Sequence, residues 1–398
     1  MEDFAVFRSP QTILYGRKSF EQIGVEAALR GQKALIVSDQ VMSGLGYVGK
    51  CQEYLERNGV EFEQYTGVES EPTDDYVAEA LVLFQNTGCD LVISLGGGSC
   101  IDTAKAIAVL ATNGGYIGDY RADRTLAEKD PIPHLAIPTT AGTGSEATDV
   151  TVITNTTTDV KVMIKQPAFM PAVAIVDPLL SASSPKHVTA ATGIDALSHA
   201  VEAYLSKRAH PMTNTMALSA MKLIVENIES AYKDGDNLDA REAMSLGALQ
   251  AGIAFTNASV CLVHGMSRPI GALFHVPHGY SNAMLLPAVL EYSKDSCTDR
   301  LADLGRIFQQ DRSALSNDEA ADVAVASVKS LCSKLDIPNL KSWGIDETAY
   351  TNAISKMAAD ALDSGSPAHN PRLPTQGELE DLYRICYDYE FTSEVKTR

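Results

Sequence analysis

Short apolar runs alternate with longer amphipathic segments through the first half of the chain. The runs KALIVSD (33–39), DLVISL (90–95), HLAIP (134–138) and AVAIVD (172–177) are short and rich in β-branched residues, as buried strands are. Between them, YVGKCQEYLERNG and DYVAEALVLFQNTG have helical periodicity and close on glycine. This alternation predicts an α/β layer with a mainly parallel, Rossmann-like sheet.

The pattern changes after DPLLSASSP (177–185). Just before it, TVITNTTTDVKVMI (151–164) has two β-branched runs around a polar turn, which predicts a β-hairpin. From Lys186 onward only long helical patterns are found. We therefore predict two domains, an α/β domain over residues 1–185 and an all-helical domain over residues 186–398.

Composition and charge narrow the class of protein. The chain is 45% hydrophobic and 21% charged, an ordinary globular composition, and its net charge of −19 argues against nucleic acid or an acidic membrane as the main partner. No apolar stretch approaches the roughly 20 residues that span a bilayer, and MEDFAVFRSP does not resemble a signal peptide. Seven cysteines without a CxxC pair suit a reducing compartment, so we expect a cytoplasmic protein.

A glycine turn joins a strand to a helix in LVISLGGGSCIDTAKAIAVLA. Gly96, Gly97 and Gly98 would let the backbone approach a ligand, and the following helix would offer N–H groups and its positive dipole end to phosphate. The spacing is not GxGxxG, so a purely structural turn is the alternative.

Two further features favour a dinucleotide. Asp39 ends the first strand of the pattern, where a carboxylate can accept hydrogen bonds from the adenosine ribose of NAD and repel the 2′-phosphate of NADP. Its alternative role is to cap the helix that begins in DQVMSGLG. PTTAGTGSEAT (138–148) is a loop rich in glycine and hydroxyl groups that follows another strand. Together with the glycine turn, these features predict an NAD site.

The second half contains a candidate metal site. In GIDALSHAVEAY, Asp195 and His199 are four residues apart, on one face of a helix, although such a pair can also be a surface contact. LVHGMSRPIGALFHVPHG adds His264 within a helical pattern and His278 beyond its end. One carboxylate and three imidazoles suit Fe²⁺ or Zn²⁺. In an extended HVPH, His275 would point away from His278, so we interpret it as a pocket wall.

Four blocks, GGGSCIDTAKAIA, IPTTAGTGSEAT, GIDALSHAVEAY and VHGMSRPIGALFHVPHGYSNAMLLP, resemble the signatures of the iron-containing (group III) alcohol dehydrogenases. The resemblance runs from LYGRKSF to the C-terminal helices. It implies an N-terminal α/β domain that binds NAD(P), an all-helical domain that binds the metal, and an active site in the cleft between them.

Carried over position by position, the resemblance assigns roles to individual residues. The implied metal ligands are Asp195, His199, His264 and His278, and Phe255 matches an aromatic residue on the substrate and nicotinamide side. The implied dinucleotide contacts are Asp39, Gly97, Gly98, Ser99, Asp102, Thr139, Thr140, Ser145 and Lys161. The implied reaction is metal-assisted hydride transfer between nicotinamide C4 and a small alcohol or aldehyde. No protein general base is identified.

Two positions depart from the family pattern. Many members carry a histidine four residues after the third ligand, where this chain has Arg268. A guanidinium there suits the carboxylate, phosphonate or sulfonate tail of an acidic aldehyde, and its alternatives are pairing with a protein carboxylate or stacking on Phe274. Glu71 stands where relatives often have Asn near the cofactor, which leaves the adenine-side contacts open.

Other classes of function fit less well. A lyase of the dehydroquinate synthase type differs in its ligands, a metal hydrolase would not need Asp39 and the glycine turn, and a non-catalytic descendant would show damaged ligands. We therefore expect an NAD-dependent, metal-containing alcohol dehydrogenase that acts mostly as an aldehyde reductase, with NAD(H) and one Fe²⁺ or Zn²⁺. We also expect a homodimer or larger homo-oligomer. A general short-chain primary alcohol dehydrogenase is the alternative to an enzyme for acidic aldehydes.

Overall fold

The protein is described from a computed structural model over residues 4–158, 160–309 and 315–391. It forms two compact units, one of residues 8–184 and one that combines residues 4–7 with 185–391. Residues 4–7 therefore group with the helical unit and not with the strands that follow them. The outer limits expected for the two domains, residues 1 and 398, lie outside the described residues.

A six-stranded parallel sheet organises the first unit, in the order β1-β8-β5-β4-β2-β3. Its strands are β1 (Thr12–Tyr15), β2 (Lys33–Val37), β3 (Glu61–Tyr65), β4 (Leu91–Gly96), β5 (His134–Pro138) and β8 (Val173–Val176). The four strands expected from apolar runs are β2, β4, β5 and β8. The two that the pattern missed, β1 and β3, are the edge strands, whose side chains are only partly buried.

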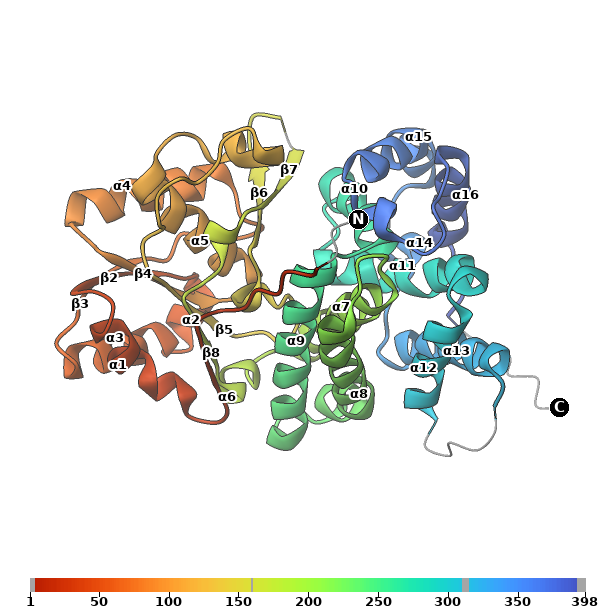
Figure 1. Cartoon of the computed structure of the whole chain (residues 1–398), viewed down its shortest axis with the longest axis horizontal. Coiled ribbons are helices and arrows are strands. Elements are labelled where there is room, and N and C mark those ends of the chain that lie inside the picture. The colour runs from red at the N-terminus through yellow and green to blue at the C-terminus, as the bar shows by residue number, and fades with distance from the viewer. Residues whose placement is uncertain (1–3, 159, 310–314, 392–398) are drawn as a thin grey trace. The chain divides into compact units, whose positions relative to one another are not determined.

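Helices cover both faces of this sheet (Figure 1). They are α1 (Ile23–Ala28), α2 (Gln40–Gly44), α3 (Tyr47–Arg57), α4 (Asp74–Thr87), α5 (Gly98–Asn113) and α6 (Pro178–Ser181). Successive side chains of a strand point to opposite faces. Leu35 and Val37 therefore join the core under α4 and α5, whereas Ala34 and Ile36 join the core with α1 and α3. Burial on both faces explains the continuous apolar runs of the inner strands.

The predicted hairpin is present outside the main sheet. Strands β6 (Val150–Asn155) and β7 (Val160–Lys165) pair antiparallel, with Val150 opposite Lys165. Ile153 and Ile164 are buried in the core that also contains α4 and α5. The hairpin is thereby held next to α5, the helix that follows the glycine turn.

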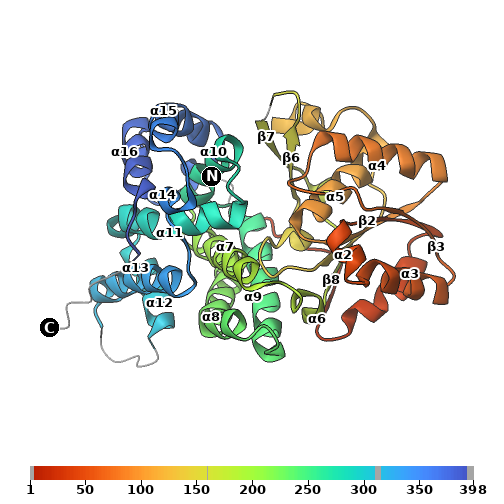
Figure 2. The ribbon, with the colours of Figure 1, turned by 180° about the vertical axis from the view of Figure 1, so that it is seen from behind.

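The second unit is helical, and its described residues between 185 and 391 contain no strand. Its helices are α7 (Lys186–Leu205), α8 (Pro211–Lys233), α9 (Leu238–Ala258), α10 (Leu262–Phe274), α11 (His278–Ser293), α12 (Thr298–Phe308), α13 (Asn317–Lys334), α14 (Leu340–Trp343), α15 (Glu347–Asp363) and α16 (Gln376–Tyr387). Helices α7, α8 and α9 pack side by side, as Figures 1 and 2 show. The α/β fold followed by a helical part confirms the predicted fold class.

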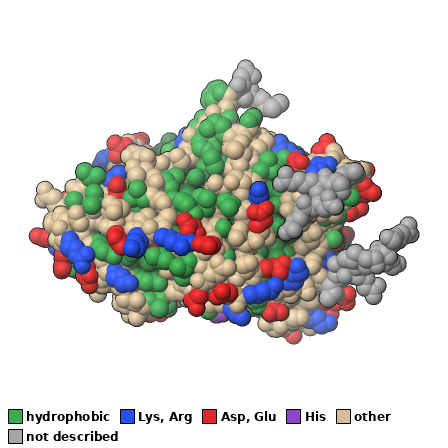
Figure 3. Space-filling model, turned by 90° about the horizontal axis from the view of Figure 1, so that it is seen from below, with side chains coloured by type: hydrophobic (Ala, Val, Ile, Leu, Met, Phe, Trp, Pro, Cys, Tyr) green, Lys and Arg blue, Asp and Glu red, His purple; other side chains and the backbone are tan. Residues whose placement is uncertain are grey.

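Among the described residues, no single helix is long and apolar enough to cross a membrane. Helices α9 and α10 together have the length and apolar composition of a membrane-spanning segment, but a bend of 102° separates them. On the face drawn in Figure 3, Lys and Arg side chains are interspersed with Asp and Glu.

Candidate metal centre and nucleotide-binding turn

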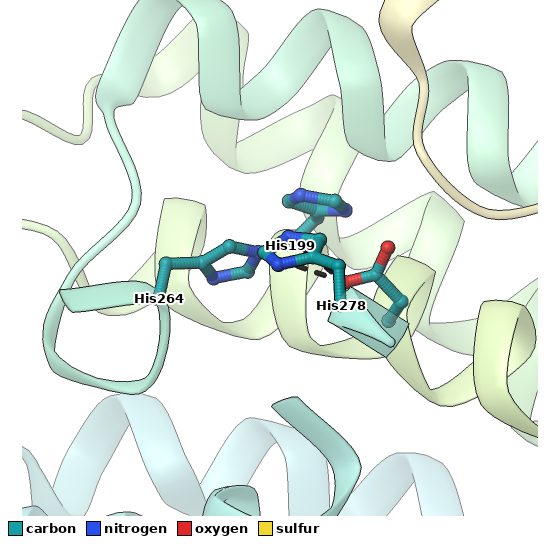
Figure 4. A group of neighbouring side chains, drawn as sticks. His199, His264 and His278 are labelled. Atoms are coloured by element: carbon teal, nitrogen blue, oxygen red, sulfur yellow. Dashed lines mark ion pairs between the residues drawn. The ribbon is translucent and has the colours of Figure 1, made fainter. Parts of the chain in front are cut away.

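Four side chains of the helical unit converge on one point. Asp195 and His199 come from α7, His264 from α10 and His278 from the first turn of α11. Each offers one ligand atom, and the four atoms all lie within 4.8 Å of one another. Figure 4 shows the three imidazoles meeting beside the carboxylate. The structure therefore brings together all four residues that the sequence indicated as metal ligands.

Local structure explains how the chain delivers these side chains. The i, i+4 spacing places Asp195 and His199 on one face of α7. Helix α10 ends at Phe274, its C-cap His275 has a left-handed φ of 53°, and α11 begins at His278. The expectation of an extended backbone at His275 is therefore wrong, because this residue forms the C-cap that turns the chain. Its exposed side chain lies outside the four-residue cluster.

Glu202, which the sequence analysis did not single out, holds His264. Its Oε2 lies 2.6 Å from Nδ1 of His264, and its Oε1 accepts the backbone N–H of Val263 at 2.6 Å. Glu202 is seven residues after Asp195 and three after His199, so the helical period places it on the same face of α7. That spacing is the signal that could have found it.

Asn282 is a second residue that the sequence analysis missed. Its Nδ2 donates to Oδ1 of Asp195 at 2.7 Å and lies 3.1 Å from the Nε2 atoms of both His264 and His278. A donor group with partial positive charge thus faces three of the four candidate ligand atoms. The other end of the amide, Oδ1, is buried without a hydrogen-bond partner.

An aromatic stack orients His199. Phe255, near the end of α9, stacks on one side of His199, with ring centroids 4.3 Å apart and planes 16° from parallel. The ring of His264 also stacks on His199, with centroids 4.4 Å apart. Phe255, for which a place beside the substrate and nicotinamide is expected, packs directly against a candidate ligand.

The charges in this cluster favour a bound cation. Burial raises the pKa of Asp195, but His199, His278 and His264 outweigh it and hold that pKa well below its usual value. Burial lowers the pKa of His264, whereas Glu202 and Asp195 raise it, with a net value of about 8. Asp195, His199 and His264 are buried, while the side chain of His278 is 37% exposed. An ionised carboxylate and three imidazoles are a ligand set that fits a divalent ion.

Arg268 follows His264 by one turn of α10 and is partly buried. Burial lowers the pKa of Arg268 to about 10, although the Glu202 carboxylate acts in the opposite direction. Phe274, the expected stacking alternative, packs against Tyr350 with ring centroids 5.8 Å apart. The Glu202 carboxylate thus contributes to the electrostatic surroundings of Arg268.

In the α/β unit, the glycine turn leads from β4 into α5 as predicted. Gly97 is the N-cap of α5 and is extended, with φ −73° and ψ −173°. A Cβ at Gly98 would lie 2.9 Å from the Thr143 side chain, whereas at Gly97 the nearest neighbour would be 3.8 Å away. Gly98 is therefore required by packing inside the protein, and Gly97 is the position with room beside it. The first N–H groups of α5 have no acceptor within the helix.

Asp39 serves as a helix cap and also lines a cavity. Its Oδ1 accepts the N–H of Met42 at 2.8 Å, so Asp39 caps the N-terminus of α2. Its Oδ2 accepts a hydrogen bond from the Cys100 thiol at 3.7 Å. A cavity of about 370 Å³ borders this carboxylate. Its lining residues are Asp39, Gln40, Val41, Val68, Glu69, Ser70, Gly97, Ser99 and Cys100. Three of the expected dinucleotide contacts, Asp39, Gly97 and Ser99, therefore share one cavity.

Asp102 and Ser145 belong to a buried network around Lys105. Asp102 accepts the Ser145 hydroxyl at 2.5 Å and the N–H of Val152 at 2.8 Å. The Lys105 Nζ donates to Ser145 Oγ at 2.8 Å, Thr148 Oγ1 at 2.9 Å and the carbonyl of Val150 at 2.6 Å. Burial lowers the pKa of Lys105 to about 8. Lys105 was missed by the sequence analysis, and it ties the 145–150 loop to α5.

Thr139 and Thr140, two further expected contacts, lie around the same turn. The backbone N–H of Thr139 donates to the carbonyl of Gly96 at 3.0 Å, and the Thr140 side chain is the nearest group to Gly97. Lys161, on β7, lies 3.4 Å from Glu71. Glu71 therefore interacts with a residue that the family resemblance places at the cofactor.

Comparison with known proteins agrees with both halves of this description. The sequence profile of the iron-containing alcohol dehydrogenases matches residues 10–178, and that of the C-terminal part of the Fe-containing alcohol dehydrogenase family matches residues 189–387.

Similar proteins align over nearly the whole chain. The 1,3-propanediol dehydrogenase of Klebsiella pneumoniae is 38% identical over 382 residues, which cover 95% of this chain and 97% of the relative. A crystal structure of a 1,3-propanediol oxidoreductase superposes with a TM-score of 0.93 at 37% identity, covering 96% of this chain and 100% of the other. Sulfoacetaldehyde reductase from Bifidobacterium kashiwanohense, solved in complex with NAD⁺, superposes with a TM-score of 0.86 at 27% identity, over 97% and 100%. This chain belongs to the iron-containing alcohol dehydrogenase family.

Proposed function

We propose that this protein is an NAD(H)- and metal-dependent alcohol dehydrogenase that acts mainly as an aldehyde reductase. The observation that carries the proposal is the convergence of Asp195, His199, His264 and His278, whose ligand atoms lie within 4.8 Å of one another. Within the proposal, the helical unit binds the metal through these four residues. The α/β unit binds the dinucleotide at the glycine turn.

The division of chemistry between the cofactors and the chain follows from the two sites. When bound, NAD(H) supplies the hydride, and the divalent ion polarises the substrate oxygen and stabilises the negative charge that develops on it. Asp195 remains ionised among the histidines, and Phe255 keeps the His199 ring in place. In the α/β unit, the N-terminus of α5 favours the diphosphate, and Asp39 accepts from the ribose hydroxyls. The loop tied down by Lys105 then forms a fixed wall beside the turn.

For the substrate, we propose a small aldehyde with an anionic tail that Arg268 recognises. In support, Arg268 lies one turn of α10 after the candidate ligand His264, and its planar guanidinium suits the recognition of such a tail. A carboxylate, phosphonate or sulfonate group can accept charge-assisted hydrogen bonds from a guanidinium. The similarity to a sulfoacetaldehyde reductase supports the same class.

A general short-chain primary alcohol dehydrogenase is the second candidate. Its support is the 38% identity with 1,3-propanediol dehydrogenase, whose name indicates an uncharged substrate. In this case Arg268 acts as the structural partner of Glu202 and has no contact with the substrate.

Turnover with matched aldehydes separates the two candidates. We would measure NADH oxidation by the metal-reconstituted enzyme with propanal, succinic semialdehyde, phosphonoacetaldehyde and sulfoacetaldehyde. The proposal expects kcat/KM for one acidic aldehyde to exceed that for propanal about 100-fold, or about 2.7 kcal/mol of transition-state discrimination. Arg268→Ala should remove most of that preference and spare propanal. If neutral and acidic aldehydes are turned over equally and Arg268→Ala affects neither, the acidic-aldehyde proposal is wrong and the second candidate, a general alcohol dehydrogenase, is supported.

Three finer expectations stay predictions. They are the choice of Fe²⁺ over Zn²⁺ in this chain, the preference for NAD over NADP through Asp39, and assembly into a homodimer or larger homo-oligomer. The bound metal is identified by metal analysis after anaerobic purification. Kinetics with NADH and with NADPH measure the cofactor preference, and sedimentation measures the oligomeric state.

A further inference from the structure

The carboxylate of Glu202 makes two short hydrogen bonds to one turn of α10. Oε2 lies 2.6 Å from His264 Nδ1, and Oε1 accepts from Val263 N–H, also at 2.6 Å. Glu202 and His264 are both buried. Both oxygens are thus engaged with residues 263 and 264, so Glu202 determines the position of the His264 ring as well as its polar surroundings.

The protonation state of the ring nitrogens follows from these partners. A neutral imidazole has one N–H and one lone pair, and a carboxylate without a proton can only accept. Nδ1 of His264 therefore carries the hydrogen, and the lone pair lies on Nε2. On the opposite side of the ring, the Asn282 amide nitrogen lies 3.1 Å from Nε2, in position to donate to that lone pair. The shorter contact, with Glu202, selects the Nδ1–H tautomer, and the Asn282 nitrogen is compatible with it.

We propose that Glu202 is a positioning residue for the metal centre, which holds His264 in the Nδ1–H tautomer with the Nε2 lone pair directed to the ion. The inference rests on the proposed metal centre and adds to it a residue that does not touch the ion. Partners of this kind typically contribute 10- to 100-fold to metal affinity, because they remove the competing tautomer and fix the ring.

Glu202→Gln is the informative variant because the side chains have nearly the same shape. An amide has one acceptor oxygen and one donor nitrogen. If its oxygen accepts from Val263, its nitrogen faces His264 Nδ1 and favours the opposite tautomer, whose Nε2 carries a hydrogen. If the amide is reversed, the Val263 N–H loses its acceptor. We expect Zn²⁺ affinity, measured by competition with a chromogenic chelator, to fall at least tenfold.

Nitrogen NMR of the metal-free protein gives a readout that a merely structural role would not change. With ¹⁵N-labelled histidine, at an alkaline pH where imidazole is neutral, the wild-type His264 signals should show the Nδ1–H form. Glu202→Gln should shift them toward the Nε2–H form. The signals are assigned by their loss in His264→Ala.

The controls separate failure of this inference from failure of the proposed metal centre. Glu146→Gln alters another buried glutamate, in the α/β unit, and should leave Zn²⁺ affinity unchanged. If His264→Ala binds Zn²⁺ as tightly as the wild type, the proposed centre is wrong. If His264→Ala loses affinity while Glu202→Gln keeps both the wild-type affinity and the Nδ1–H signals, only the role of Glu202 is overturned.

A second variant decides the question if Glu202→Gln does not fold, as judged by circular dichroism. Glu202→Asp keeps the charge and both acceptor oxygens but withdraws them from Nδ1 by one methylene. We expect a Zn²⁺ affinity between those of the wild type and His264→Ala. Wild-type affinity together with Nε2–H signals for His264 would overturn the inference.

Discussion

The rings of His199 and Phe255 are stacked, with centroids 4.3 Å apart and planes 16° from parallel. His199 is a candidate metal ligand on α7, whereas Phe255 comes from α9. The stack therefore couples the position of a ligand to the packing of a neighbouring helix.

Phe255→Leu should weaken metal binding without removing a ligand. Aromatic pairs contribute about 0.5–1.5 kcal/mol beyond their buried area, so we expect Zn²⁺ affinity to fall about two- to tenfold in a chelator competition. The matched control is Phe274→Leu, because the Phe274 ring packs in a tilted geometry against Tyr350 and not against a candidate ligand. It should lower stability and leave metal affinity as it was, and an equal loss in both variants would contradict the role of the stack.

Removal of the metal should destabilise the protein as well as inactivate it. A ligand that binds only the folded state stabilises it by about 2.7 kcal/mol at 100 times its Kd. We expect treatment with a chelator to abolish NADH oxidation and to lower the Tm, and Fe²⁺ or Zn²⁺ to restore both. Asp195→Asn should lose the metal-dependent rise in Tm because it removes the carboxylate among the four ligands. A Tm that does not respond to metal in the wild type would contradict the proposed centre.

Lys105→Met should damage both stability and dinucleotide binding. The variant leaves the largely buried Asp102 carboxylate without the Lys105 ammonium, 3.8 Å away, and breaking a buried pair from one side costs about 3–5 kcal/mol. The loop that contains Ser145 also loses its anchor. We expect a lower free energy of unfolding by denaturant and a raised Kd for NADH by fluorescence titration.

The double variant Lys105→Met with Asp102→Asn tests the origin of this loss. Since it also removes the isolated carboxylate, it should recover part of the free energy of unfolding but little of the NADH affinity. Failure of the double variant to recover any stability would mean that the charge of Asp102 is not the cause.

Glu146 should make stability depend on pH. Burial raises its pKa from 4.5 to about 7, although Lys105 acts in the opposite direction. Between these values the folded state keeps a proton that the unfolded state has lost, so the free energy of unfolding falls as pH rises through this window. Glu146→Gln removes the cost of ionisation and should stabilise the protein by up to about 3 kcal/mol at pH 8, and by little at pH 4. Denaturant titrations at both pH values measure it, and parallel profiles for the two proteins would contradict the assignment.

Local patterns in the sequence were sufficient for much of the fold. The four buried strands, the hairpin and the change to an all-helical pattern near residue 185 follow from hydrophobic periodicity and turn residues, which act over a few neighbours along the chain. The edge strands β1 and β3 were missed because their side chains are only partly buried and their strand conformation depends on pairing with β8 and β2.

The candidate site divides in the same way. The placing of Asp195 and His199 on one face of a helix is a local property of the helical period, and the sequence by itself determined it. The contact between Glu202 and His264 joins residues 62 positions apart, and the contact between Asp102 and Ser145 joins residues 43 apart. Only the tertiary structure decided these pairs, because they depend on how whole helices and loops pack and on the left-handed turn at His275. Hydrophobic periodicity predicts which face of a helix a residue occupies, whereas the residues that contact that face are determined by tertiary packing.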